Sequence, residues 1–91
     1  MNGKYLSPTN ASSPDTLTRK EFKVLQLIAS GLKTKEIAEE FKVSPRTVET
    51  QRAHILKKLK LRGIANLVIY ALKYEIIDKS GKPTNKIWAS Y

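Results

Sequence analysis

The fold is decided by residues 34–58, which read TKEIAEEFKVSPRTVETQRAHILKK. The first part predicts a short helix from Thr34 to about Phe41, because its apolar residues recur at helical spacing. Ser44 and Pro45 predict the start of the next helix, since serine is a strong N-cap and proline at the first helical position loses no hydrogen bond. Two helices joined by so short a turn are typical of a helix-turn-helix.

The helix that follows Ser44, expected to run to about Lys58, has one apolar and one polar side. Val48, Ile55 and Leu59 recur at spacings of seven and four, which predicts a buried side. The opposite side carries Arg46, Glu49, Thr50, Ala53 and Lys57. Between residues 42 and 62 positive charge dominates, because Glu49 alone opposes Lys42, Arg46, Arg52, Lys57, Lys58, Lys60 and Arg62.

Helices are predicted on both sides of this pair as well. Thr18, with Glu21 three residues later, predicts a capping box and a helix from about Arg19 to Ser30, and Gly31 is its natural stop. A further apolar stretch predicts a fourth helix. We therefore expect an all-α, four-helix domain that contains a helix-turn-helix, at residues 17–77. A flexible linker or tail at residues 1–16 and a C-terminal tail at residues 78–91 are expected to flank it.

The composition favours a polyanionic partner. Seventeen Lys+Arg against 8 Asp+Glu give the 91 residues a formal net charge of +9, and nucleic acid is the commonest polyanion in a cell. Without cysteine the chain forms neither a disulfide nor a thiolate metal site. No apolar run approaches the roughly 18 residues of a membrane span, and the first ten residues do not read as a secretory signal. We expect a cytoplasmic protein without cofactor, metal or membrane contact.

The charged helix suggests a way of binding DNA. Its N-terminus carries unpaired backbone N–H groups and the positive end of the helix dipole, which suit a phosphate. Short side chains in its middle let base edges come close, and the lysines near its end can reach the flanking backbone. The alternative is an ordinary three-helix core whose outer face is merely solvated.

Several stretches together resemble a known family. They are residues 17–25 (LTRKEFKVL), 31–32 (GL), 35–38 (KEIA), 43–50 (VSPRTVET), Ile55 and residues 58–59 (KL). The combination resembles the C-terminal four-helix domain of LuxR/NarL/FixJ-type transcription regulators. The resemblance implies that the third helix reads the major groove of duplex DNA and that the fourth helps to form a dimer.

A shorter resemblance concerns the segment before the domain. Residues 3–8 (GKYLSP) are similar to the linker that follows the receiver domain in two-component response regulators. An unremarkable polar tail is the alternative interpretation of six residues. The similarity favours the effector half of a response regulator, whose phosphorylated aspartate would lie outside this sequence.

The chain departs from the family pattern at several positions. Gln51 stands where a histidine is common, and Lys33-Thr34 replaces a Ser/Asn pair. Thr34 can still cap the helix, but Glu36 is then expected to lose the register of a capping box. Glu49 and Ala53 stand where Lys or Arg is frequent. Glu49 can accept a hydrogen bond from cytosine N4 and Ala53 can touch a thymine methyl, but Glu49 can equally pair with Arg46 or Arg52. The target sequence therefore does not follow from the resemblance.

The predicted DNA contacts gather at the start of the second helix and along the third. They are Thr34, Lys35, Ser44, Arg46, Thr47, Glu49, Thr50, Gln51, Ala53, His54, Lys57 and Lys58.

The fourth helix, expected at residues 64–77, is apolar around much of its circumference. Ile64, Leu67, Val68, Ala71 and Leu72 can face the core. Ile69, Tyr70 and Ile76 are then left with too little core to cover them, which predicts that they form a dimer surface. The alternative cover for these three is the C-terminal tail, through Ile87 and Trp88.

Other classes of function fit the sequence less well. An enzyme is disfavoured, because no nucleophile–base pair, metal cluster or glycine-rich phosphate loop is present and His54 is the only histidine. A sigma-factor-like or other protein-binding helical module stays open as the alternative. The expected partners are double-stranded DNA, a second copy of the chain and RNA polymerase.

Overall fold

The computed structural model of the protein describes residues 12–85. Its elements are the short 3-10 helix η2 (Pro14–Thr16) and four α-helices, α1 (Arg19–Ala29), α2 (Thr34–Phe41), α3 (Pro45–Leu59) and α4 (Ile64–Lys73). Within these residues the only β pairing is an isolated bridge between Ile77 and Pro83. The predicted all-α fold with a helix-turn-helix is confirmed. No helix of the described part combines the length and the apolar character needed to span a lipid bilayer.

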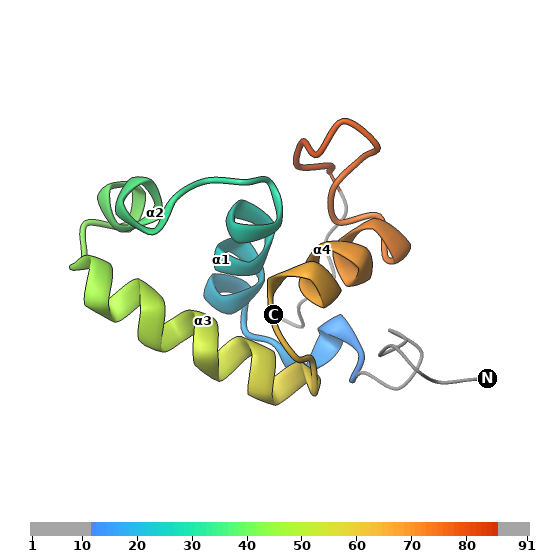
Figure 1. Ribbon diagram of the computed structural model, residues 1–91, viewed down its shortest axis with the longest axis horizontal. Coiled ribbons are helices and arrows are strands. Elements are labelled where there is room, and N and C mark those ends of the chain that lie inside the picture. Colours follow the sequence, from blue (N-terminus) through green and yellow to red (C-terminus); the bar gives the residue numbers. More distant parts are fainter. Residues whose placement is uncertain (1–11, 86–91) are drawn as a thin grey trace.

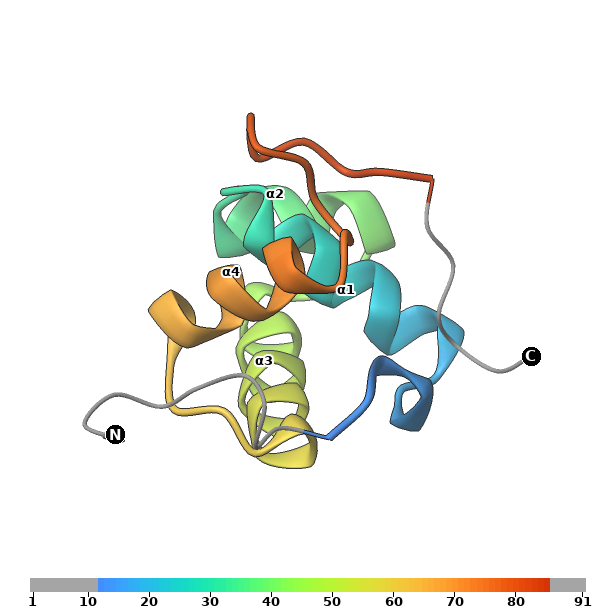
Figure 2. The ribbon, with the colours of Figure 1, turned by 90° about the vertical axis from the view of Figure 1, so that its right-hand side faces the viewer.

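The first helix is the centre of the arrangement. It contacts α2, α3 and α4, and it lies between α2 and α4 in Figure 1. The long α3 runs along the lower left edge of the molecule in Figure 1 and descends from the centre to the bottom in Figure 2, and the segment after α4 stands at the top of both views. One side of α3 is therefore left open, away from the rest of the chain.

The predicted start and stop of α1 are confirmed. The Glu21 N–H donates to Thr18 Oγ1 at 3.1 Å, and the Thr18 N–H donates to Glu21 Oε1 at 2.8 Å. This reciprocal pair satisfies two N–H groups that a helix end would otherwise leave unpaired. After α1 ends at Ala29, Gly31 takes a left-handed φ of 94°, which a residue without Cβ adopts at little cost.

The second helix begins at Thr34 as predicted, but its capping differs from the prediction. The N-cap is Lys33, so that Glu36 occupies the third helical position, and the Lys33 N–H donates to Glu36 Oε1 at 2.7 Å. The expectation that Glu36 loses its register was wrong, because the helix starts one residue after Lys33 rather than being capped by Thr34. The carboxylate supplies its half of a capping box without a serine or threonine partner.

The turn between α2 and α3 occupies three residues. Lys42 takes a left-handed conformation (φ 57°) as the C-cap of α2, and its N–H bonds back to the last turn of that helix. Ser44 then caps α3, since its Oγ accepts from the Thr47 N–H at 3.1 Å, and Pro45 is the first helical residue. These contacts bear out the start of α3 that the sequence predicted.

Four helices contribute to one core. The largest fully buried side chains are one proline in η2 and apolar or aromatic residues from every α-helix and the segment after α4: Pro14, Val24, Leu25, Ile37, Val48, Ile55, Leu59, Leu67, Tyr70 and Ile76. Burial of this set accounts for much of the favourable free energy of folding, because removal of apolar surface from water is the dominant stabilising term.

The fourth helix ends earlier than predicted. It stops at Lys73 instead of reaching residue 77, because Glu75 takes a left-handed φ of 60° and turns the chain. The Ile76 N–H then bonds to the Ala71 carbonyl oxygen at 2.7 Å. The turn directs Ile76 and Ile77 back into the core, where both are buried.

The predicted dimer surface on this helix was wrong for two of its three residues. Tyr70 and Ile76 are each 0% exposed, whereas Ile69 is 46% exposed. Burial raises the pKa of the Tyr70 hydroxyl, with smaller contributions from the charges of Tyr74 and Asp15. The hydroxyl therefore stays protonated and donates to the Ser12 carbonyl oxygen at 2.6 Å.

The cover for these residues comes from both segments that the prediction placed in tails. At the N-terminal end, the Ser12 N–H bonds to the Leu59 carbonyl oxygen at 3.1 Å, and Pro14 of η2 is buried. Residues 12–16 thus pack on the domain. The resemblance carried by residues 3–8 lies outside the described residues.

At the C-terminal end, residues 78–85 fold into a turn held against α1. Asp78 Oδ1 accepts from the N–H groups of Ser80 and Lys82 at 2.8 and 3.0 Å. Gln26 of α1, a buried polar residue, donates through Nε2 to the carbonyl oxygens of Ile76 and Thr84 at 3.0 and 3.2 Å. The proposed cover by Ile87 and Trp88 lies outside the described residues.

Candidate nucleic-acid interface

The open side of α3 presents the residues that the sequence placed there. Val48, Ile55 and Leu59 are buried against the domain. The opposite side is exposed throughout, and we call it the α3 face: Arg46, Glu49, Thr50, Ala53 and Lys57. A helix that packs through one side and exposes short polar and basic side chains on the other can enter the major groove of B-DNA, whose width admits an α-helix.

The beginning of α3 is an exposed cluster of hydrogen-bonding groups. Ser44, Arg46 and Thr47 are all exposed. The hydroxyl groups of Ser44 and Thr47 lie 3.0 Å apart and form a hydrogen bond with each other. Ser44 Oγ also accepts the capping bond from the Thr47 N–H. The first turn of a helix also carries a partial positive charge from the helix dipole, which attracts phosphate.

The start of α2 offers the two remaining predicted contacts outside α3. Lys35 is exposed, while Thr34 is half-buried. Both residues belong to the first turn of α2, where the dipole is again positive. Lys35 therefore adds one full positive charge at the start of the first helix of the helix-turn-helix.

Glu49 lies on the α3 face and does not form the ion pair with Arg46 or Arg52 that the sequence left open. Among residues 12–85 no ion pair joins Glu49 to Arg46 or Arg52. Its carboxylate is exposed. An acceptor in this position is chemically suited to a cytosine amino group.

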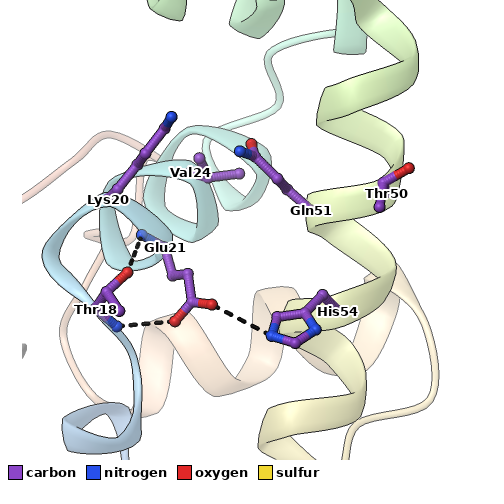
Figure 3. Close-up of a pocket in the computed structure, with 7 residues that line it drawn as sticks. All are labelled: Thr18, Lys20, Glu21, Val24, Thr50, Gln51 and His54. Atoms are coloured by element: carbon purple, nitrogen blue, oxygen red, sulfur yellow. Dashed lines mark hydrogen bonds and ion pairs between the residues drawn. The ribbon is translucent and has the colours of Figure 1, made fainter.

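Three of the predicted DNA contacts turn toward α1 instead of standing on the α3 face. Lys58 Nζ lies 2.8 Å from Glu21 Oε1, and His54 Nε2 lies 3.5 Å from Glu21 Oε2. Gln51 is half-buried between the helices, and its Oε1 is buried without a hydrogen-bond partner in the described structure. Figure 3 shows Gln51 and His54 pointing from α3 toward α1.

Glu21 links the two helices, and sequence reasoning assigned it only a capping role. Its carboxylate accepts from the Thr18 N–H and from Lys58 and faces His54. Burial alone would raise the pKa of Glu21, but the hydrogen bonds from Lys58 and Thr18 and the charges of Lys58 and His54 outweigh it, so the pKa is lowered. Glu21 therefore stays ionised and holds the C-terminal half of α3 against α1.

A cleft of about 330 Å³ lies between α1 and α3. We call it the α1–α3 cleft, and Figure 3 draws the residues that line it: Thr18, Lys20, Glu21, Val24, Thr50, Gln51 and His54. Thr50 belongs to both the cleft and the α3 face. Lys20 is the one lysine in this lining, and sequence reasoning missed it because it precedes the helix-turn-helix by fourteen residues.

The exposed apolar residues of the described chain gather on α4. Ile64, Ile69 and Leu72 are 38%, 46% and 41% exposed, and we call them the α4 patch. The prediction had placed Ile64 and Leu72 in the core. Tyr70 and Ile76 are buried instead, and Ile64 and Leu72 are exposed.

Comparison with known proteins identifies the family. Residues 15–71 match the family of bacterial regulatory proteins, luxR family. The chain is 39% identical over 79 residues to oxygen regulatory protein NreC of Staphylococcus haemolyticus, and the aligned residues cover 86% of this chain and 36% of that protein. It is 47% identical over 62 residues to the NreC of Staphylococcus carnosus, with coverages of 68% and 29%. Against the NreC of Staphylococcus aureus it is 38% identical over 81 residues, with coverages of 82% and 37%. The chain spans about a third of the length of these relatives.

Proposed function

Because the chain belongs to the luxR family of bacterial regulatory proteins, we propose that it binds duplex DNA sequence-specifically, with α3 in the major groove. The family is one of DNA-binding transcription regulators, and its match to residues 15–71 includes the helix-turn-helix of this chain. The observation that supports the proposed docking is the α3 face, whose five residues are all exposed.

Basic side chains supply affinity by neutralising phosphates. Arg46 and Lys57 are exposed near opposite ends of α3, and Lys35 is exposed at the start of α2. Each phosphate contact releases counterions, so binding weakens as salt rises. Lys58 is a different case, since its ammonium group is held by Glu21 in the free chain and would have to be shared or exchanged to reach a phosphate.

Side chains between these cations supply sequence preference. Thr50 can donate or accept a hydrogen bond at a base edge, Glu49 can accept from cytosine N4, and Ala53 fits a thymine methyl. Each good contact of this kind discriminates against a wrong base by roughly 1–3 kcal/mol. Phosphate contacts fix the position of α3 on the duplex, and this position decides which base pairs the three side chains reach.

A second copy of the chain is the partner that we propose for the α4 patch. The revised set is Ile64, Ile69 and Leu72, and it leaves out Tyr70 and Ile76 because they are buried. A twofold pair would place two recognition helices roughly 34 Å apart, one turn of DNA, and so read two half-sites. We propose a free chain that is mostly monomeric and pairs cooperatively on DNA. RNA polymerase, the third partner expected from the sequence, stays a prediction.

The lengths of the relatives support an effector role within a longer protein. The chain aligns with about a third of each NreC protein, and these relatives are named as regulatory proteins. We propose that the chain corresponds to the effector half of a response regulator. Its signal would then be received outside these 91 residues.

Selection of bound duplexes from random sequence tests the proposal directly. The chain is expected to enrich a motif with two related half-sites, and the enriched duplex should bind more tightly than a scrambled one. Affinity for both should fall with salt. Absence of duplex binding at low salt would contradict the proposal and favour a protein-binding module.

A further inference from the structure

We propose that the mouth of the α1–α3 cleft receives a backbone phosphate of the bound duplex and that Lys20 makes the contact. Lys20 belongs to α1, outside the helix-turn-helix. The inference rests on the proposed function, since it requires α3 to lie in the major groove. It adds a contact site that the resemblance and the sequence pattern did not assign.

The α1–α3 cleft adjoins the α3 face. Thr50 lies on the α3 face and also lines the cleft, so that the cleft opens directly beside the surface that faces the bases. A helix in the major groove is flanked on both sides by sugar–phosphate backbones, because the groove is only about 12 Å wide. One backbone must therefore run along the wall of α3 that carries His54 and faces α1.

The ammonium group of Lys20 is accessible to an anion. Lys20 is exposed, and no carboxylate among residues 12–85 lies within ion-pair distance of its ammonium group. Its Nζ lies 6.0 Å from the centroid of the Phe41 ring. An aromatic face attracts a cation without occupying its hydrogen-bond donors. The side chain is thus steered by Phe41 while its three N–H groups remain available to an anion.

The charges around the cleft favour an anion at its mouth. Glu21 is the only acidic residue in the lining. Its charge is already balanced by Lys58 at 2.8 Å, and Oε1 also accepts from the Thr18 N–H. The positive end of the α1 dipole adds to the charge of Lys20, which is the second residue of that helix. The mouth of the cleft is therefore attractive to a phosphate in spite of the carboxylate at its base.

Lys23 provides the matched control. It lies three residues after Lys20 on the same helix and is exposed, but it does not line the cleft. Lys20→Ala and Lys23→Ala remove the same charge from the same helix. A general effect of net charge on DNA binding would change both variants equally, whereas a seated phosphate distinguishes them.

The first measurement is the affinity of the whole chain for its selected duplex as a function of salt. Counterion release of about 0.9 ion per phosphate predicts that Lys20→Ala lowers the salt slope by about 0.9 and weakens binding about fivefold near ~0.15 M salt. Lys23→Ala should leave the slope within error, and Lys20→Arg should retain it. Equal melting temperatures and circular dichroism spectra establish that the variants fold alike.

The second measurement locates the contact. Single methylphosphonate substitutions are placed in turn along the backbone beside each half-site, so that one phosphate charge is removed at a time. For the wild-type chain and Lys23→Ala, every position that meets a cation should lower affinity; at one of these positions, beside the cleft, Lys20→Ala should show no further loss. Equal behaviour of Lys20→Ala and Lys23→Ala, or a penalty spread evenly along the backbone, would overturn the proposal.

Failure of this inference is distinguishable from failure of the proposed function. If the wild-type chain binds the duplex and Lys57→Ala reduces the salt slope while Lys20→Ala does not, only the contact at the cleft is refuted. If the wild-type chain binds no duplex, both proposals fall together.

Discussion

Replacement of Glu21 tests whether the link between α1 and α3 stabilises the domain. Glu21→Ala removes the acceptor of the Thr18 N–H, a capping contact worth about 1 kcal/mol. It also removes the ion pair with Lys58, whose side chain is 33% exposed, so that solvent screening limits this pair to about 1 kcal/mol or less. We assign nothing to His54, which is 62% exposed. The expected loss is about 2 kcal/mol, or roughly 8–16 °C in melting temperature for a domain of this size.

Glu21→Gln separates the two contributions. The amide oxygen still accepts from the Thr18 N–H, while the charge that holds Lys58 is lost. The matched control is Glu36→Gln, because Glu36 has the same capping position in α2 and no cation within ion-pair distance among the described residues. Both glutamine variants lose the attraction of a carboxylate to a helix dipole. The difference between them therefore reports the ion pair with Lys58.

The pH dependence of this difference has a definite sign. The pKa of Glu21 is lowered below its ordinary value of 4.5 in the folded chain. A lowered pKa contributes stability that is fully present above the unfolded value and is lost as the pH falls through the folded value. The advantage of the wild-type chain over Glu21→Gln should thus hold near neutral pH and shrink as the pH falls below about 4.5, where the unfolded chain binds the proton first. It is lost once the carboxyl of the folded chain is protonated as well.

The assay is urea denaturation followed by circular dichroism, because guanidinium chloride would screen the ion pair. Lys58→Met and the double variant Glu21→Gln/Lys58→Met complete a thermodynamic cycle, whose coupling energy is the pair contribution. A coupling energy near zero, with equal stabilities of Glu21→Gln and Glu36→Gln, would refute the argument that Glu21 holds α3 to α1.

Five further variants test separate parts of the structure. Lys57→Ala should weaken specific and non-specific duplex binding alike and lower the salt slope by about 0.9, and a slope unchanged in a salt titration would remove this phosphate contact. Thr50→Ala and Glu49→Ala should change which sequence is preferred in a repeated selection; a uniform loss for all sequences would mean that a different side of α3 faces the bases. Ile69→Lys should abolish cooperative binding to two half-sites while sparing a single half-site, as titration of both duplexes would show, and retained cooperativity would exclude the α4 patch from the dimer. Tyr70→Phe should lower the unfolding free energy by about 1 kcal/mol, because the Ser12 carbonyl loses its donor; an unchanged urea midpoint would count against that bond.

Local signals were sufficient for the beginnings of the helices and for the exposed side of α3. The capping bonds of Thr18 with Glu21 and of Ser44 with Thr47 each join residues three apart. Such bonds form within one helical turn, so the residue types alone predict them. The side of α3 that Val48 and Ile55 bury follows likewise from helical periodicity. The sequence by itself therefore determined the helix-turn-helix and the side of α3 that stays exposed.

Contacts between distant segments could not be predicted in this way. Glu21 and Lys58 are 37 residues apart, and Gln26 bonds to Thr84 across 58 residues. No pattern within α1 marks these two side chains for such partners. The way α1 packs on α3 brings Glu21 to Lys58, and the way the segment after α4 folds against α1 brings Thr84 to Gln26.

The outer surface of α4 was decided by tertiary structure as well. Periodicity identified an apolar helix but placed Tyr70 and Ile76 outside the core and Ile64 inside it. The left-handed turn at Glu75 and the contact of Tyr70 with Ser12 bury the first two, which leaves Ile64 exposed with Ile69 and Leu72. Helix formation depends on neighbours within about four residues, whereas burial depends on which distant segments fold over a side chain. For this reason the sequence alone determined where α4 begins, and only the packed chain determined which of its residues face solvent.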